Sequence, residues 1–91
     1  MQITTTSGFK CDINENVLDD WRFTKAVARA HSDDDSIRMN AAVDLVSLIL
    51  RDSELDYYKF VEKKNNGIVT EDTVTKDLQS IIEQIKALKN S

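Results

Sequence analysis

Two short alternations of apolar and polar residues open the chain and predict a small β-hairpin over residues 1–14. Ile3 and Thr5 share one side of the first strand, and Phe9, Cys11 and Ile13 share one side of the second. A period of two is typical of strands with one buried face. The Ser-Gly pair between the strands supplies the backbone freedom of a tight turn. Because an isolated hairpin is marginal in water, we expect the second strand to rest on the rest of the chain.

Helical spacing begins at residue 17 and predicts a first helix over 17–30. Either Asn14 or Asn16 can cap it, because a short side-chain oxygen accepts from the free N–H groups of a helix start. Asp19 and Asp20 fall in its first turn, where the helix dipole favours negative charge. The stripe expected to face the core comprises Val17, Trp21, Thr24 and Ala28.

Two further helices are predicted in the middle of the chain. Residues 37–51 are apolar on nearly all sides, which indicates a central, buried helix, and either Asp35 or Ser36 caps it. Residues 54–64 follow Ser53, which with Asp56 resembles a capping box, and this helix stops at an Asn-Asn-Gly sequence. Its inward positions are expected to be Leu55, Tyr58 and Val61.

The last helix, expected to run from residue 71 to residue 90, is capped by Thr70 and has the longest apolar stripe. Its members recur at spacings of four and three and are Val74, Leu78, Ile81, Ile82, Ile85 and Leu88. Such a stripe usually packs within its own domain. The other interpretation is that Ile82, Ile85 and Leu88 are shared with a second subunit.

These elements predict a mainly α fold with a small N-terminal β-hairpin, an α+β chain in which about four helices pack as a small bundle. We expect a single domain over residues 1–91, with the hairpin in 1–14 and the bundle in 17–90. Phe23 lies off the stripe of the first helix, between two basic residues, and is a candidate anchor for a partner, since large aromatic residues are enriched at interface hot spots.

Charge and composition narrow the class of protein. The 91 residues include 12 basic and 16 acidic side chains, for a net charge of −4. This balance argues against nucleic-acid binding, which needs a basic face. The longest apolar run is far short of a membrane span, so no membrane partner is expected. One cysteine and no secretory signal favour the cytoplasm.

The residues with chemical potential are few. His31 precedes Asp33, Asp34 and Asp35, but the alternating oxygen donors and central glycine of a Ca²⁺ loop are missing. A polar loop that caps a helix explains them better than a metal site or a base. Cys11 is expected to act as a small buried hydrophobe. We therefore expect no enzyme activity, no cofactor and no metal.

Three segments of the chain together resemble a known family. They are the block from Gly8-Phe9 through Val17-Leu18-Asp19-Asp20-Trp21, the later Asn66-Gly67-Ile68-Val69, and a long amphipathic helix ending in Ala87-Leu88-Lys89-Asn90-Ser91. The chain is similar to the tail assembly chaperones of long-tailed phages and prophages of Gram-positive bacteria. The resemblance covers nearly the whole chain and is strongest from residue 8 to residue 21.

The resemblance implies a non-enzymatic protein that acts in the host cytoplasm and is absent from the mature virion. Several copies would bind the tape measure protein, keep its apolar helices soluble, recruit tail tube protein and self-associate as a homo-oligomer. The residues expected at a partner or oligomer interface are Phe23, Ile82, Ile85 and Leu88. The alternative is a small acidic protein that inhibits a host protein by occupying a basic site, motivated by the net charge and the aspartates at 33–35.

Overall fold

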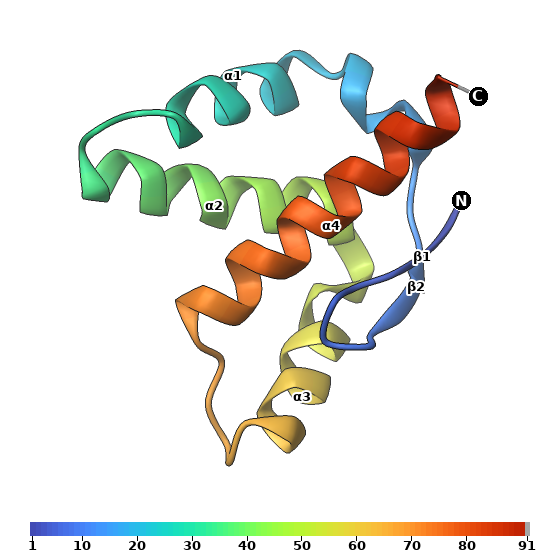
Figure 1. The fold of residues 1–91 in the computed structure, drawn as a ribbon, viewed down its shortest axis with the longest axis vertical. Coiled ribbons are helices and arrows are strands. Elements are labelled where there is room, and N and C mark those ends of the chain that lie inside the picture. Colours follow the sequence, from blue (N-terminus) through green and yellow to red (C-terminus); the bar gives the residue numbers. More distant parts are fainter. Residues whose placement is uncertain (91) are drawn as a thin grey trace.

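The chain begins with an antiparallel hairpin that rests on the helices (Figure 1). In the computed structural model, which describes residues 1–90, β1 (Gln2–Thr4) pairs with β2 (Lys10–Asp12) so that Ile3 lies opposite Cys11. Gly8 has φ +101°, a conformation that side-chain-bearing residues rarely adopt. The turn predicted at this glycine is confirmed. Phe9 packs its ring against two aromatic rings of the third α-helix, with centroids 5.4 and 5.5 Å away.

The predicted first helix is divided in two. Residues Glu15–Asp19 form a 3₁₀ helix, η1, which Asn14 caps, and α1 (Trp21–Ala30) follows. The break lies at Asp20, whose backbone is extended and whose side chain accepts from Arg22 N at 2.8 Å. Val17 and Trp21 therefore do not share one helical stripe. The expectation that Trp21 faces the core is wrong, because the side chain is 74% exposed.

The helices α1 and α2 (Asp35–Leu50) form an antiparallel pair joined by a short polar turn (Figure 1). Asp34 caps α2, because its Oδ1 accepts from Ser36 N at 2.8 Å and from Ile37 N at 3.3 Å. The two residues expected in this role, Asp35 and Ser36, lie inside the helix. The C-terminal half of α2 is the buried part, and Val43 is exposed despite the apolar sequence around it.

A 3₁₀ turn, η2 (Arg51–Ser53), redirects the chain into α3 (Glu54–Lys64), whose bounds match the prediction. Ser53 makes no side-chain capping bond, so the predicted capping box does not form. Tyr57 and Val61 are the buried positions of α3, whereas Leu55 is exposed. The inward face is therefore rotated from the expected one, because the hairpin approaches α3 on the side of Tyr57.

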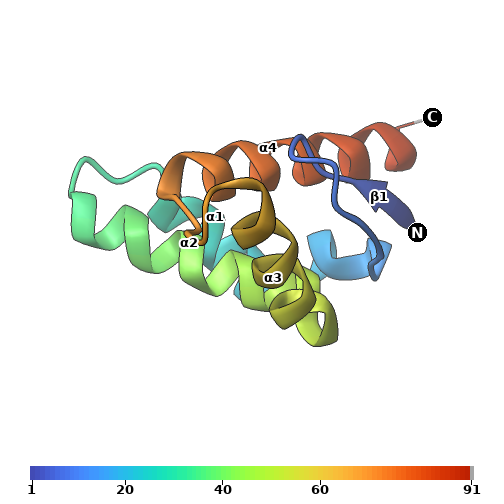
Figure 2. The same ribbon diagram turned by 90° about the horizontal axis from the view of Figure 1, so that it is seen from below.

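The final helix, α4 (Glu71–Lys89), crosses over α2 and carries the hairpin on its flank (Figure 2). Before it, Asn66 and Gly67 have positive φ, and Gly67 N donates to Glu62 O at 2.8 Å, which ends α3. Thr70 caps α4 as predicted, since its side chain accepts from Thr73 N.

The core lies where α4 covers the α1–α2 pair and where the hairpin meets α3. Every element except η2 contributes a buried side chain or packs directly against one. The expected fold class, a mainly helical bundle with a small N-terminal hairpin, is confirmed. The largest fully buried side chains are Tyr57, Ile3, Ile81, Ile85, Val61 and Asp77.

Candidate functional site

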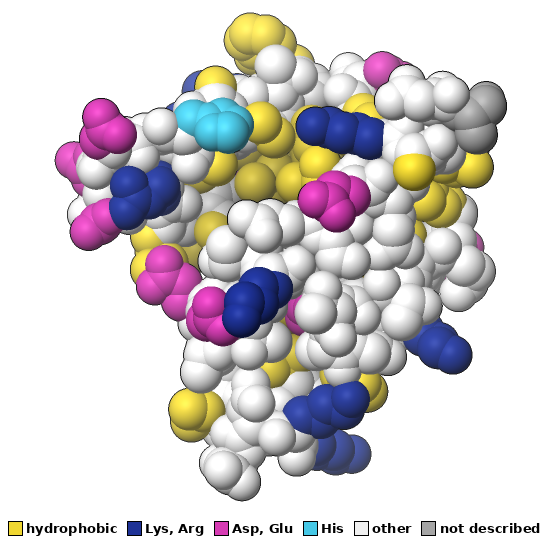
Figure 3. Space-filling model, in the orientation of Figure 1, with side chains coloured by type: hydrophobic (Ala, Val, Ile, Leu, Met, Phe, Trp, Pro, Cys, Tyr) yellow, Lys and Arg dark blue, Asp and Glu magenta, His cyan; other side chains and the backbone are white. Residues whose placement is uncertain are grey.

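An apolar groove lies open between α1, α2 and α4. Its volume is about 520 Å³. In Figure 3 hydrophobic side chains form the floor of a hollow over these three helices, and charged side chains surround it. The groove is lined by Phe23, Val27, Ala30, His31, Arg38, Met39, Ala42, Leu45, Glu71, Thr75, Leu78, Gln79, Ile82, Glu83 and Lys86.

The floor of the groove follows from helical spacing. Phe23 and Val27, four residues apart, present neighbouring side chains on α1, and Leu78 and Ile82 do the same on α4. The small side chain of Ala42 lies between larger residues of α2 and fills little of the space. At the base of the groove Phe23, Leu45 and Leu78 are buried. Its open apolar surface is contributed by Val27, Met39, Ala42 and Ile82.

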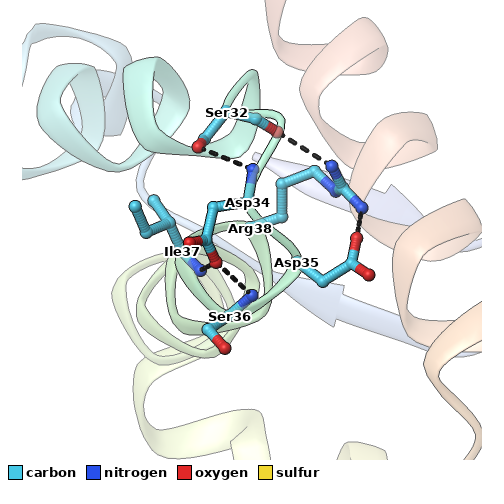
Figure 4. Close-up of polar contacts among 6 residues, drawn as sticks. All are labelled: Ser32, Asp34, Asp35, Ser36, Ile37 and Arg38. Carbon is cyan, nitrogen blue, oxygen red and sulfur yellow. Dashed lines mark hydrogen bonds and ion pairs between the residues drawn. The ribbon is translucent and has the colours of Figure 1, made fainter.

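The rim is charged but balanced. Arg38 and Lys86 contribute positive charge, and Glu71 and Glu83 contribute negative charge. Arg38 is held in place, because it donates to Ser32 O at 2.9 Å and forms an ion pair with Asp35 (Figure 4). The equal numbers of acidic and basic side chains differ from the net charge of −4 of the whole chain.

The structure brings two of the four predicted site residues together in this groove. Phe23 on α1 and Ile82 on α4 both line it. Ile82 is half-buried, as a contact residue at an open groove should be. Phe23 is only 6% exposed, so the expectation that it lies off the packed face of its helix is corrected. The break at Asp20 changes which face of α1 meets α2 and α4.

The other two predicted site residues lie elsewhere. Ile85 is buried in the core, where it offers no surface to a partner. Leu88 is partly exposed near the end of α4, outside the groove lining. Lys89, its neighbour, pairs with Asp19 of η1 at 2.9 Å and fixes this end of α4 against the start of the chain.

Sequence reasoning missed a buried polar cluster centred on Asp77. Its carboxylate accepts from Ser7 N at 2.8 Å, from Ser7 Oγ at 2.7 Å and from Tyr57 OH at 2.7 Å. Burial, followed by the bond to this carboxylate, raises the pKa of Tyr57 well above its ordinary value. Lys64 Nζ donates to Ser7 O at 2.7 Å from α3. The only signal in the sequence is an aspartate beside Leu78 in an apolar stripe.

The cluster acts as a joint rather than as a reactive site. It connects the hairpin turn to α3 and α4, and both carboxylate oxygens of Asp77 accept hydrogen bonds. Thr5 extends it, since its hydroxyl is hydrogen-bonded to Ser7 Oγ at 3.0 Å and also accepts from Phe9 N at 3.0 Å. The apolar opening at the surface lies elsewhere, in the groove.

The residues considered for chemistry are dispersed. His31 terminates α1, and within residues 1–90 no group of three His, Cys, Asp or Glu side chains is placed to hold a metal ion. Cys11 is half-buried on β2, and burial raises the pKa of its thiol, which lowers its reactivity. Asp34 and Asp35 are engaged in the α2 cap and in the pair with Arg38 (Figure 4).

Comparison with protein-family models, with curated proteins and with solved structures finds no match for this chain. Among residues 1–90, no helix combines the length and the apolar character that crossing a membrane requires. The structure alone therefore describes the class of protein, which is a helical bundle with an N-terminal hairpin and an open apolar groove.

Proposed function

We propose that this protein is a phage tail assembly chaperone that binds an apolar helical segment of the tape measure protein and keeps it soluble during tail assembly. The observation that carries the proposal is the open groove between α1, α2 and α4. The similarity of the 8–21 block to the chaperone family supplies the identity of the client. The groove supplies a physical means of holding it.

The shape of the groove favours a helix as its occupant. Its lining residues on α4 run from Glu71 to Lys86, which at 1.5 Å per residue is a row of about 22 Å. A client helix of about four turns has this length. Helix-in-groove recognition places one apolar face of an amphipathic helix against such a floor. Covering that face lowers the tendency of the client to aggregate.

The charges of the molecule suit this role. The rim of the groove has balanced charge, so binding depends on the apolar floor and is weakly sensitive to salt. The net charge of −4 favours solubility of the loaded complex in the host cytoplasm. Self-association of several copies along one client, with recruitment of tail tube protein, belongs to the same proposal.

The alternative, an acidic inhibitor of a host protein, receives less support from the aspartates at 33–35. Asp34 caps α2, and Asp35 pairs with Arg38. Only Asp33 of the three has no hydrogen bond or ion pair within residues 1–90. With Asp34 held in the helix cap and Asp35 paired with Arg38, fewer free carboxylates remain to bind a basic site.

The experiment is co-expression of the chain with the tape measure protein encoded beside it, followed by measurement of the soluble fraction of the client. Ile82→Glu places a charge in the groove, and Val43→Glu places the same charge on an exposed position outside it. We expect wild type and Val43→Glu to keep the client soluble. Ile82→Glu should leave most of the client insoluble, because the charge weakens binding at least about tenfold, the equivalent of 1.4 kcal/mol.

Two control measurements accompany this experiment. Far-UV circular dichroism must show that both variants remain folded. The retained complex should survive high salt, whereas an acidic inhibitor would release its partner. A client that is soluble with Ile82→Glu to the same extent as with wild type, or insoluble with every version, contradicts the proposal.

A further inference from the structure

A second hollow lies on the other side of the α1–α2 pair and shares no lining residue with the groove. Its volume is about 390 Å³. Arg22, Lys25 and Arg29 recur at spacings of three and four and so lie along one face of α1. The groove-lining residues of α1 occupy the opposite face. The α2 side of this basic hollow is formed by Asp44, Ser47 and Leu48.

The local charge of the basic hollow opposes that of the molecule. Helix α1 carries these three basic residues and no acidic one, although the chain as a whole has a net charge of −4. Two of the basic side chains are anchored by aspartates. Arg22 donates to Asp20 at 3.0 and 2.6 Å, and Arg29 Nη2 donates to Asp44 at 2.5 Å.

The hollow still has unused donors after these pairings. The ammonium group of Lys25 has no hydrogen bond or ion pair within residues 1–90. Arg29 Nε is buried and has no partner in the same described part of the chain. A buried N–H without an acceptor is costly, on the order of 1–3 kcal/mol, and native proteins rarely leave one. Because this N–H is closed to solvent, the donor that a ligand reaches directly is the exposed ammonium of Lys25.

An exposed aromatic residue lies beside the basic face of α1, outside the residues that line the hollow. Trp21 precedes Lys25 by four positions, so the two side chains are neighbours on the surface of α1. Its 74% exposure is unusual for the one tryptophan of a small domain. Tryptophan and arginine are the residues most enriched at interface hot spots. The combination is that of a protein-docking surface rather than of a simple ion site.

We propose that this basic hollow, with Trp21 beside it, binds an acidic segment of a partner protein through its carboxylate groups. Lys25 supplies the unpaired positive charge, and a charge-assisted hydrogen bond from its ammonium group to a carboxylate is among the stronger ones. A nucleic acid is the poorer occupant, because affinity for phosphates requires many basic contacts, and here Asp44 lies within the lining. The inference is independent of the helix-binding groove.

The test uses an oligoglutamate peptide at low salt and follows the fluorescence of Trp21, which is the only tryptophan. We expect a saturable change with oligoglutamate and none with oligoglutamine of equal length. Lys25→Glu should weaken peptide binding about tenfold or more. Lys59→Glu, the same charge change at an exposed position of α3, is the matched control and should bind like wild type.

Two further measurements separate this proposal from the proposed function. Binding should fall steeply as salt rises, and Ile82→Glu, which acts on the groove, should leave peptide affinity unchanged. Failure of this proposal is thereby separated from failure of the chaperone proposal. The inference is overturned if the fluorescence shows no saturable change, or if Lys25→Glu and Lys59→Glu bind the peptide with equal affinity. It is also overturned if polyuridylate binds more tightly than oligoglutamate, or if inorganic phosphate at matched ionic strength gives an equal response.

Discussion

The two sides of α4 differ in how completely the chain covers them. On the hairpin side, Asp77 and Ile81 are 2% and 1% exposed, and Gln84 Nε2 donates to Thr4 O of β1 at 2.8 Å. On the groove side, Ile82 is half-buried and faces the open groove, above Leu78, which is 7% exposed. Adjacent residues of one helix thus belong to a closed joint and to an uncovered surface.

The difference shows which kinds of side chain a fold can leave open. The closed side contains a carboxylate, which would be costly to bury without donors, and the hairpin turn supplies them. The groove side is apolar, and leaving it exposed forfeits only the burial of its area, at about 25 cal/mol per Å². A surface of that kind can remain available for a partner without destabilising the fold.

Removal of the Asp77 carboxylate is expected to have the largest effect. Asp77→Ala leaves Ser7 and the buried hydroxyl of Tyr57 without an acceptor, and we expect a loss of roughly 4 kcal/mol of unfolding free energy, measured by urea denaturation. Asp72→Ala is the control on the same helix, because Asp72 forms only an exposed pair with Lys76 at 3.0 Å and should cost less than about 1 kcal/mol. Equal losses in the two variants would contradict the assignment of a closed joint.

Two consecutive isoleucines of α4 provide the second comparison. Ile81 is fully enclosed and Ile82 is half-buried at the groove. We expect Ile81→Ala to cost about 3 kcal/mol, since it creates a cavity, and Ile82→Ala to cost about 1 kcal/mol, since the site is already open. Urea midpoints measure both. A loss for Ile82→Ala as large as that for Ile81→Ala would show that the groove is closed in solution.

Local signals in the sequence are sufficient for much of the fold. The turn at Gly8, the end of α3 before Gly67 and the cap at Thr70 each depend on residues within a few positions. Turn and cap chemistry acts over one helical turn. These features could therefore be predicted without knowledge of the tertiary structure.

The buried faces and contacts that the sequence does not predict are those decided by a competing local cap or by a residue far away in the chain. The stripe through Trp21 assumed one uninterrupted helix, but the side chain of Asp20 starts a new helix and changes the face that is buried. The contact of Asp77 with Ser7 joins residues 70 positions apart, and no periodicity indicates it. Helical spacing selects Ile82, whereas Phe23 is selected because it is expected to lie off the packed stripe; neither signal indicates that the two line the same groove.

The smallest expected effect is on the pH dependence of stability and comes from two consecutive tyrosines of α3. Burial, followed by its hydrogen bond to Glu54, raises the pKa of Tyr58 from 10.0 to about 12. The same causes, with Asp77 as the acceptor, raise the pKa of Tyr57 further. In the unfolded chain both phenols ionise near their ordinary pKa of about 10. The stability that these shifts represent is therefore complete below the ordinary value and declines as the pH rises above it.

We expect the urea midpoint to be constant up to about pH 9 and to fall between pH 10.0 and about 12, the range set by the two pKa values of Tyr58. Tyrosinate absorbance should rise together with unfolding, because the enclosed Tyr57 ionises only when the joint opens. Tyr58→Phe should reduce the slope without removing it, since Tyr57 still contributes. Ionisation of both tyrosines in a folded chain would show that the hairpin side of α4 admits water, and the contrast with the groove would disappear.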